Sequence, residues 1–155
     1  MVMEDQQGWT PPNWVYIKNR PPTDNTYFEN LTRVIFTAGL NWNTIEVKWK
    51  GFKRAFEGFS IEKVAKFTEE DVERLMGDTE IVRNRAKISA TIFNALQIMA
   101  IRKEFGSFQK YLDSLDKSDN YSRVIEDLSR RFKHVGMSTA EIFLWSVGED
   151  LKHEW

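Results

Sequence analysis

Apolar residues recur at intervals of three and four along almost the whole chain. This spacing places them on one face of successive helices, whereas the strict alternation of a half-buried strand is not sustained in any segment. The clearest stripes are Tyr27, Leu31, Val34, Ile35 and Ala38; Ile45, Trp49, Phe52 and Phe56; and Ile81, Ile88, Ile92, Ala95 and Met99. The pattern predicts an all-α fold of roughly seven to nine helices.

Local start and stop signals agree with this periodicity. Thr26 and Thr68 each stand three residues before an acidic residue, which is the spacing of a capping box, and Ser60 precedes the apolar run IEKVAKF. We expect these three residues to be N-caps. Gly106 follows the longest apolar stripe and is expected to end that helix.

All four prolines lie in the first 22 residues, together with Trp9 and Trp14. Proline prevents a regular helix there, but a disordered tail rarely contains tryptophan. We therefore expect residues 1–22 to form an arm that packs across a helical body spanning 23–155. Since 41% of the 155 residues are hydrophobic, the chain can bury one core, and a single compact domain is predicted.

The composition excludes several classes of protein. No stretch of about eighteen uninterrupted apolar residues occurs, and the N-terminal segment has no basic start followed by an apolar core, so neither a membrane span nor a signal peptide is predicted. Cysteine is absent, which excludes disulfides, thiolate metal sites and thiol nucleophiles. The net charge of −1 gives no overall attraction to nucleic acid, so DNA binding would need a local basic face.

The segment from about 122 to 148 predicts a helix, the tight turn HVGMST and a second helix. Gly136 is expected to supply a backbone conformation closed to other residues, and Ser138 or Thr139 to cap the second helix. Free backbone amides at that helix start would suit a phosphate, and the alternative is an ordinary helical hairpin. The residues predicted to face a DNA backbone are Lys133, His134, Gly136, Ser138 and Thr139.

Several motifs resemble one family of DNA-repair proteins. HVGMSTA resembles the hairpin of the helix-hairpin-helix DNA glycosylases, and AGLNW, EIVRNRAKISATIFNA, FGSF and FKHVG are similar to the 3-methyladenine DNA glycosylase I family within that superfamily. The resemblance runs in order along nearly the whole chain, from Gly8 to His153. It implies a single helix-hairpin-helix domain that acts on double-stranded DNA without a cofactor.

The resemblance assigns roles to the turn FTAGLNW. In the family this turn enters the duplex at the lesion, which implies that Gly39 fills the gap left by the flipped nucleotide and that Leu40 wedges against the opposite strand. Trp42 would be the wall on which the extruded base stacks, and Trp9 would be the aromatic residue of the arm near the pocket. The alternative is that Leu40 and Trp42 are core residues and that Trp9 only staples the arm to the body.

The chain departs from the family at its pocket and its metal site. The family's pocket glutamate, four residues before the alanine of AGLxW, is replaced by Val34, and the pocket tyrosine corresponds to Asn19. Arg20 stands where the family has a zinc-binding histidine, the cysteines are missing, and His153 alone remains, so no metal site is predicted. The base pocket is expected to contain Trp42, Trp9, Val34 and Asn19.

No catalytic residue can be assigned from the sequence. Asp150 lies only fourteen residues past Gly136, whereas the wider superfamily has an aspartate some twenty residues past the hairpin. Glu46 is expected to face solvent because it follows the inward-facing Ile45 directly, and no lysine stands out as a nucleophile for a lyase step. The basic clusters KWKGFKR and RNRAK are either flanks of a DNA path or ordinary solvated helix faces.

The leading hypothesis is a monofunctional DNA glycosylase of base-excision repair that hydrolyses the N-glycosidic bond of an alkylated purine such as 3-methyladenine. Two alternatives stay open: a glycosylase-derived module that binds damaged or distorted DNA without cutting it, and a glycosylase for a different, neutral base. The expected location is the cytoplasm or nucleoid, and the expected state is a monomer.

Overall fold

The computed structural model describes residues 12–15 and 19–152, and within these ranges every regular element is a helix. Trp9 and His153 lie outside the described residues. The described helices are α2 (Asp24–Thr37), α3 (Trp42–Ala55), the short 3-10 helix η1 (Glu57–Phe59), α4 (Ile61–Ala65), α5 (Glu69–Met76), α6 (Arg85–Phe105), α7 (Phe108–Ser114), α8 (Ser118–Arg131) and α9 (Met137–Ser146). The all-α prediction is confirmed.

Helix ends follow local side-chain chemistry. Ser60 caps α4 by accepting a hydrogen bond from the amide of Lys63, and Asp71 accepts one from the amide of Thr68 at the start of α5, as predicted. The prediction for Thr26 was wrong, because α2 already begins at Asp24. Thr23 is its N-cap, and its hydroxyl accepts the amide hydrogen bond of Thr26.

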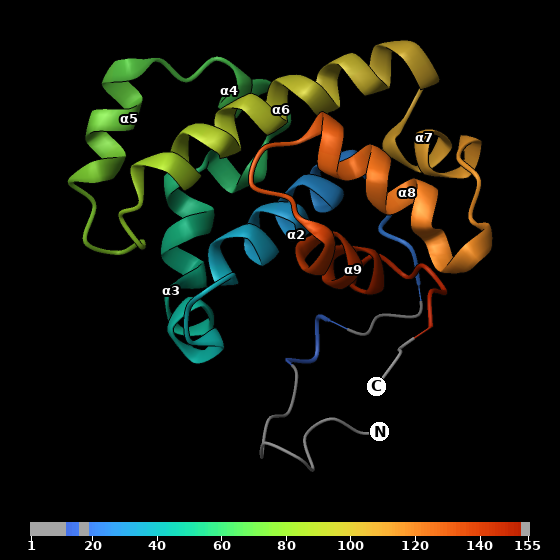
Figure 1. Cartoon of the computed structure of the whole chain (residues 1–155). Coiled ribbons are helices and arrows are strands. Elements are labelled where there is room, and N and C mark those ends of the chain that lie inside the picture. The colour runs from blue at the N-terminus through green and yellow to red at the C-terminus, as the bar shows by residue number, and fades with distance from the viewer. Residues whose placement is uncertain (1–11, 16–18, 153–155) are drawn as a thin grey trace.

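The long helix α6 supports most of the other elements (Figure 1). It packs against α2, α4, α5 and α7, while α2 in turn packs against α3 and α9. Gly106 ends α6 as predicted, with a positive φ of 98° that favours glycine. α2 is thereby enclosed on several sides, which explains why eight of its fourteen residues are buried.

Aromatic rings fill much of the core between α2, α3 and η1. The ring of Trp49 stacks on Phe52 at 5.0 Å and on Phe59 at 5.2 Å, and Phe36 meets Phe52 edge-on at 4.8 Å. Such pairs add about 0.5–1.5 kcal/mol each beyond the area they bury. The C-terminal end of α2 and the body of α3 are therefore fixed relative to one another.

An ion-pair cluster, here called the clasp, joins the segment before α2 to the far end of the chain. The guanidinium group of Arg20 contacts the carboxylates of Asp113 at 2.9 Å and Glu149 at 3.0 Å, and the ammonium group of Lys117 lies 2.9 Å from both. The Glu149 side chain is only 3% exposed. A carboxylate so buried is stable only with partners, so the clasp holds residues before α2 against α7 and the segment that follows α9.

The backbone beside the clasp is tightly packed. Gly148 has a φ of 78°, and a Cβ atom added to it would lie 2.9 Å from the backbone carbonyl of Asn19. Glycine is therefore required here both by the backbone conformation and by the space available.

We predict that Arg20→Met lowers the free energy of unfolding by roughly 1–3 kcal/mol, because it leaves buried Glu149 with one cation fewer. Urea unfolding at pH 7 measures this loss. Lys103→Met, at an exposed position on α6, is the matched control and should change stability little.

The same variant should alter the pH dependence of stability. Hydrogen bonding to Arg20 is the main cause that lowers the pKa of Asp113 from 3.8 to about 2. A carboxyl with a depressed folded-state pKa stabilises the fold above its unfolded pKa and loses that contribution as the pH falls through the folded value. The stability gap between wild type and Arg20→Met should therefore narrow between pH 4 and pH 2, and a constant gap would contradict the assignment.

Candidate base-recognition site and DNA-binding face

The turn between α2 and α3, here called the wedge turn, comprises residues 38–41. Gly39 has a φ of 77°, a conformation that favours glycine, and the side chain of Asn41 caps α3 by accepting the amide of Asn43 at 2.8 Å. Leu40 at the tip is 41% exposed. The core interpretation therefore does not hold for Leu40, whose side chain is free to contact a partner at this turn.

Lys87 of α6 holds the wedge turn in place. Its ammonium group donates to the carbonyl oxygen of Ala38 at 2.8 Å and reaches that of Phe36 at 3.5 Å. These are carbonyls at the C-terminal end of α2, where a cation is favourable. Partial burial lowers the pKa of Lys87 below its ordinary value. In the sequence this lysine stands out only as part of the basic cluster RNRAK, and no local pattern indicates its contact with the turn.

The predicted hairpin is formed by α8 and α9. Gly136 is the N-cap of α9, but its φ of −88° is open to other residues, and the positive φ lies at His134, with 61°. The expectation about the glycine conformation was therefore wrong. No side chain caps α9, so Ser138 and Thr139 do not act as caps; Ser138 is exposed and Thr139 is buried.

Asn94 of α6 clamps the hairpin turn. Its side-chain amide donates to the carbonyl of Lys133 at 3.2 Å, and its carbonyl oxygen accepts the amide of Lys133 at 2.9 Å. Asn94 is buried, and these two bonds give both the donor and the acceptor of its side-chain amide a partner. The ammonium group of Lys133 lies 4.3 Å from the ring centroid of Phe93.

Both anchors lie on the same face of one helix. Lys87 and Asn94 are seven residues apart on α6, which corresponds to almost two full turns and a rise of about 10 Å. The wedge turn and the hairpin turn are therefore held on one side of the molecule with a fixed separation, as a surface that contacts one duplex would require.

Three tryptophans gather beside the wedge turn and are called here the aromatic cluster: Trp14, Trp42 and Trp49. The ring centroids of Trp14 and Trp42 are 5.9 Å apart, with the planes 33° from parallel. Trp42 is half-buried at the first turn of α3. The described arm residue that contacts the proposed base-stacking wall is thus Trp14, while the prediction for Trp9 falls on a residue outside the described ranges.

Charged groups line the edge of this cluster. The indole N–H of Trp14 donates to the Oε1 atom of Glu46 at 3.1 Å, and Glu46 also pairs with Arg33. The guanidinium carbon of Arg33 lies 4.6 Å from the ring centroid of Trp14 and 4.9 Å from that of Trp49. Glu46 is exposed, as expected, with a side chain that is 36% exposed, and its carboxylate also contacts Trp14 and Arg33.

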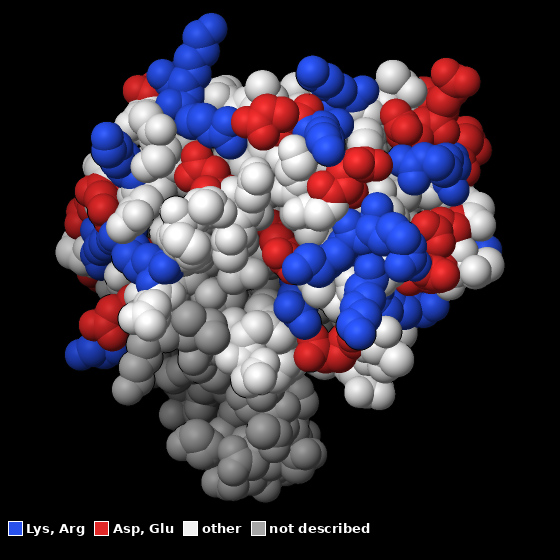
Figure 2. Space-filling model, turned by 180° about the vertical axis from the view of Figure 1, so that it is seen from behind, with Lys and Arg blue, Asp and Glu red and all other residues white. Residues whose placement is uncertain are grey.

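The basic residues of the two sequence clusters largely pair with nearby oxygens. Lys48 donates to the carbonyl of Thr79 at 3.0 Å, and the exposed side chain of Arg85 pairs with Glu73 at 2.6 Å. On the face drawn in Figure 2, one group of adjoining Lys and Arg side chains lies right of centre and is bordered by Asp and Glu, and elsewhere the two signs alternate. These contacts favour the interpretation that the two clusters are ordinary solvated helix faces over the interpretation that they flank a path for DNA.

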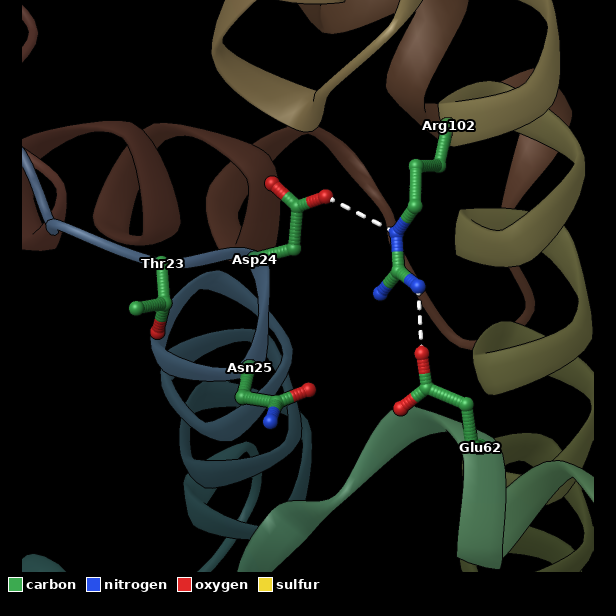
Figure 3. Close-up of a pocket in the computed structure, with 5 residues that line it drawn as sticks. All are labelled: Thr23, Asp24, Asn25, Glu62 and Arg102. Carbon is green, nitrogen blue, oxygen red and sulfur yellow. Dashed lines mark hydrogen bonds and ion pairs between the residues drawn. The ribbon is translucent and has the colours of Figure 1, made fainter.

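One hollow of about 220 Å³ lies at the other end of α2 (Figure 3). Arg102 reaches into it between Asp24, at 3.1 Å, and Glu62, so the polar groups pair with each other. Since α2 has fourteen residues, this hollow is about 20 Å along the helix from the wedge turn. It serves the attachment of α6 to α2 and α4 and is remote from the aromatic cluster.

Comparison with known proteins agrees with this geometry. A family model described as methyladenine glycosylase matches residues 13–148. The chain belongs to the methyladenine glycosylase family. It is 29% identical to DNA-3-methyladenine glycosylase 1 of Escherichia coli K12, with 91% of this chain and 89% of that protein covered, and 27% identical to DNA-3-methyladenine glycosylase of Haemophilus influenzae, with 78% and 75% covered.

A solved structure supports the same fold. The 3-methyladenine DNA glycosylase I of Staphylococcus aureus, determined to explain 3-methyladenine recognition, superposes with a TM-score of 0.77 at 28% identity and covers 92% of this chain and 88% of that one. The resemblance inferred from AGLNW and VRNRAKI is therefore confirmed.

The two residues that were expected to line the base pocket beside the tryptophans, Val34 and Asn19, lie in different surroundings from each other. Val34, at the family's glutamate position, is 2% exposed and belongs to the hydrophobic core. Asn19 is exposed, and its backbone lies against Gly148 beside the clasp. Neither side chain supplies a charge for a cationic base.

The family's structural zinc does not fit the residues present. The resemblance implies two cysteines and two histidines, but the chain has no cysteine, and Arg20 stands at one histidine position. Arg20 is itself a cation, held by Asp113 and Glu149, and no group of three or more His, Asp or Glu converges among the described residues. The clasp therefore joins the segment before α2 to the segment after α9 by charge pairing. No helix in the described part of the chain is long and apolar enough to cross a membrane.

We predict that Lys87→Met slows single-turnover base release by about tenfold or more, because the carbonyls that fix the wedge turn lose their donor and a small displacement there is costly. Affinity for undamaged duplex should change less than about threefold. Rapid-quench assays and fluorescence anisotropy measure the two quantities, with Lys103→Met as control. Equal losses in rate and affinity would contradict a role at the wedge.

Proposed function

We propose that the protein is a monofunctional DNA glycosylase of base-excision repair that removes an alkylated purine such as 3-methyladenine from double-stranded DNA. The observation that carries the proposal is the family match over residues 13–148, combined with an exposed Leu40 on a turn directly before Trp42. We further propose that it acts as a monomer inside the cell and that residues 1–22 and 23–155 form one functional unit.

The wedge turn would perform base flipping. A base inside a duplex is inaccessible to hydrolysis, and removing it from the stack costs a few kcal/mol. Insertion of Leu40 beside Gly39 would offset part of that cost by replacing the lost stacking contacts. The extruded base would then stack on Trp42, whose indole presents a large flat surface.

The hairpin would bind the phosphate backbone. The first amides of α9, after Gly136, have no side-chain cap, and Lys133, His134 and Ser138 are exposed beside them. Helix N-termini with free amides bind anions, and such contacts position a protein on DNA without reading its sequence. Together with the fixed spacing along α6, this would set the wedge at a defined place on the duplex.

The chemistry would depend mainly on the leaving group. An N3-alkylated adenine is already cationic and leaves readily, so flipping, stacking and exclusion of normal bases can supply much of the catalysis. A lyase step needs a lysine free to attack the sugar. Burial lowers the pKa of Lys87, but its ammonium group donates to the carbonyl of Ala38 and is not free to attack a sugar, which agrees with hydrolysis.

One observation favours a second candidate. Val34 is buried in the core where the family has its pocket glutamate, so this position offers no charge to a cationic base. A pocket without that carboxylate is compatible with a neutral lesion, or with binding of distorted DNA without cleavage. The base that is released, or the absence of any, separates these possibilities.

We predict that the purified protein releases 3-methyladenine from methylated genomic DNA and that Trp42→Ala lowers the single-turnover rate by about a hundredfold, because the flipped base loses its stacking surface. Chromatography of the released bases measures both. Leu40→Ala, at an exposed position, is a second variant that spares the fold and should also slow release. Salt-sensitive binding without release of any base would overturn the enzymatic proposal for alkylated purines.

We predict that Lys133→Ala weakens binding uniformly across sequences and reduces the slope of log affinity against log salt by about one. Anisotropy titrations of two unrelated duplexes at several salt concentrations measure this. Lys103→Ala is the control. A sequence-dependent loss would contradict a contact with the phosphate backbone.

A further inference from the structure

We propose that Glu46 is the carboxylate that recognises the cationic base, so that α3 supplies the charge missing at Val34 on α2. The inference rests on the proposed function and names the group that gives the pocket its preference for an alkylated purine. It is drawn from the contacts of Glu46 with Trp14 and Arg33.

Glu46 lies on the same face of α3 as the proposed stacking wall. Trp42 and Glu46 are four residues apart on this helix, and side chains at that spacing are neighbours. The Oε1 atom of Glu46 lies 3.1 Å from the indole nitrogen of Trp14, whose ring faces Trp42 at 5.9 Å. The carboxylate is thus held at the rim of the two rings between which a flipped base would lie.

Arg33 shows what kind of ligand this site accepts. Its guanidinium is a flat cation that stacks on Trp14 and Trp49 and pairs with Glu46. An N3-alkylated adenine is also a flat cation with N–H donors at its edge. The site therefore already offers aromatic faces and a carboxylate in the arrangement that such a base needs.

The ion pair with Arg33 also explains how the charge of the Glu46 carboxylate is balanced when no DNA is bound. The Arg33 side chain is only 16% exposed, so its positive charge is partly shielded from water where it pairs with the Glu46 carboxylate. A bound cationic base would compete with Arg33 for the same carboxylate. Replacing Arg33 should therefore strengthen recognition of a cation instead of weakening it.

The rings must separate to admit a base. A base stacked on both of its faces needs about 7 Å between parallel ring planes, whereas the rings of Trp14 and Trp42 are tilted by 33° with their centroids 5.9 Å apart. Trp14 must therefore move away from Trp42 and turn toward parallel before a base can enter. Such a shift would keep Glu46 within reach of the base edge, since the carboxylate belongs to α3 and not to the arm.

A binding experiment tests this without depending on cleavage. The probe is an adenine methylated on N3 and N9, a permanent cation with no sugar to lose, and its neutral counterpart is adenine methylated on N9 alone. Tryptophan fluorescence quenching gives the affinity of each probe for wild type, Glu46→Gln, Glu46→Asp and Arg33→Met. Circular dichroism and urea unfolding show that each variant is folded.

Wild type should bind the cationic probe at least about tenfold more tightly than the neutral one. Glu46→Gln should abolish this preference while leaving affinity for the neutral probe within about twofold, Glu46→Asp should restore part of it, and Arg33→Met should increase it. A retained preference in Glu46→Gln, or a parallel loss for both probes, would overturn the inference.

The outcomes for cleavage and for binding are independent. If wild type prefers the cationic probe through Glu46 but releases no base from methylated DNA, the proposed catalysis fails while Glu46 remains the recognition group. If wild type releases 3-methyladenine and Glu46→Gln does so at the same rate with the same probe preference, the glycosylase stands and the role of Glu46 is refuted.

Discussion

The position of both DNA-facing turns depends on hydrogen bonds from a single helix. Lys87 and Asn94 of α6 bond to backbone groups of the wedge turn and of the hairpin turn, which come from opposite halves of the chain. The last carbonyls of a helix have no partner within the helix, so a side chain that donates to them helps to fix the turn that follows. Because both side chains belong to one helix that packs against α2, α4, α5 and α7, the two turns share a common support.

Most of the helical framework could be predicted from the sequence, because periodicity and capping are local properties. Ser60, Thr68 and Gly106 act where their neighbours in the sequence indicate, and the error at Thr26 amounts to one turn of helix. The hairpin was located correctly, but the unusual backbone angle falls on His134. A turn distributes its strain over several residues, and the sequence does not reveal which of them takes it.

The polar part of the site could not be predicted in this way. Glu46 follows the inward-facing Ile45, so the helical pattern assigns it to the surface, and only the three-dimensional fold brings Trp14 and Arg33 to it from other segments. The clasp likewise combines residues separated by more than a hundred positions in the sequence. Contacts of this kind follow from tertiary packing, for which a single sequence carries no periodic signal.

The clasp also determines which chemical conditions can separate the segment before α2 from the segment after α9. A zinc ion held by thiolates is lost when its ligands are oxidised or when a chelator competes for the metal. Arg20, Asp113, Lys117 and Glu149 contain no sulfur and share no metal, so oxidants and chelators leave their mutual attraction intact. The clasp therefore depends neither on the redox state of a thiol nor on a supply of metal.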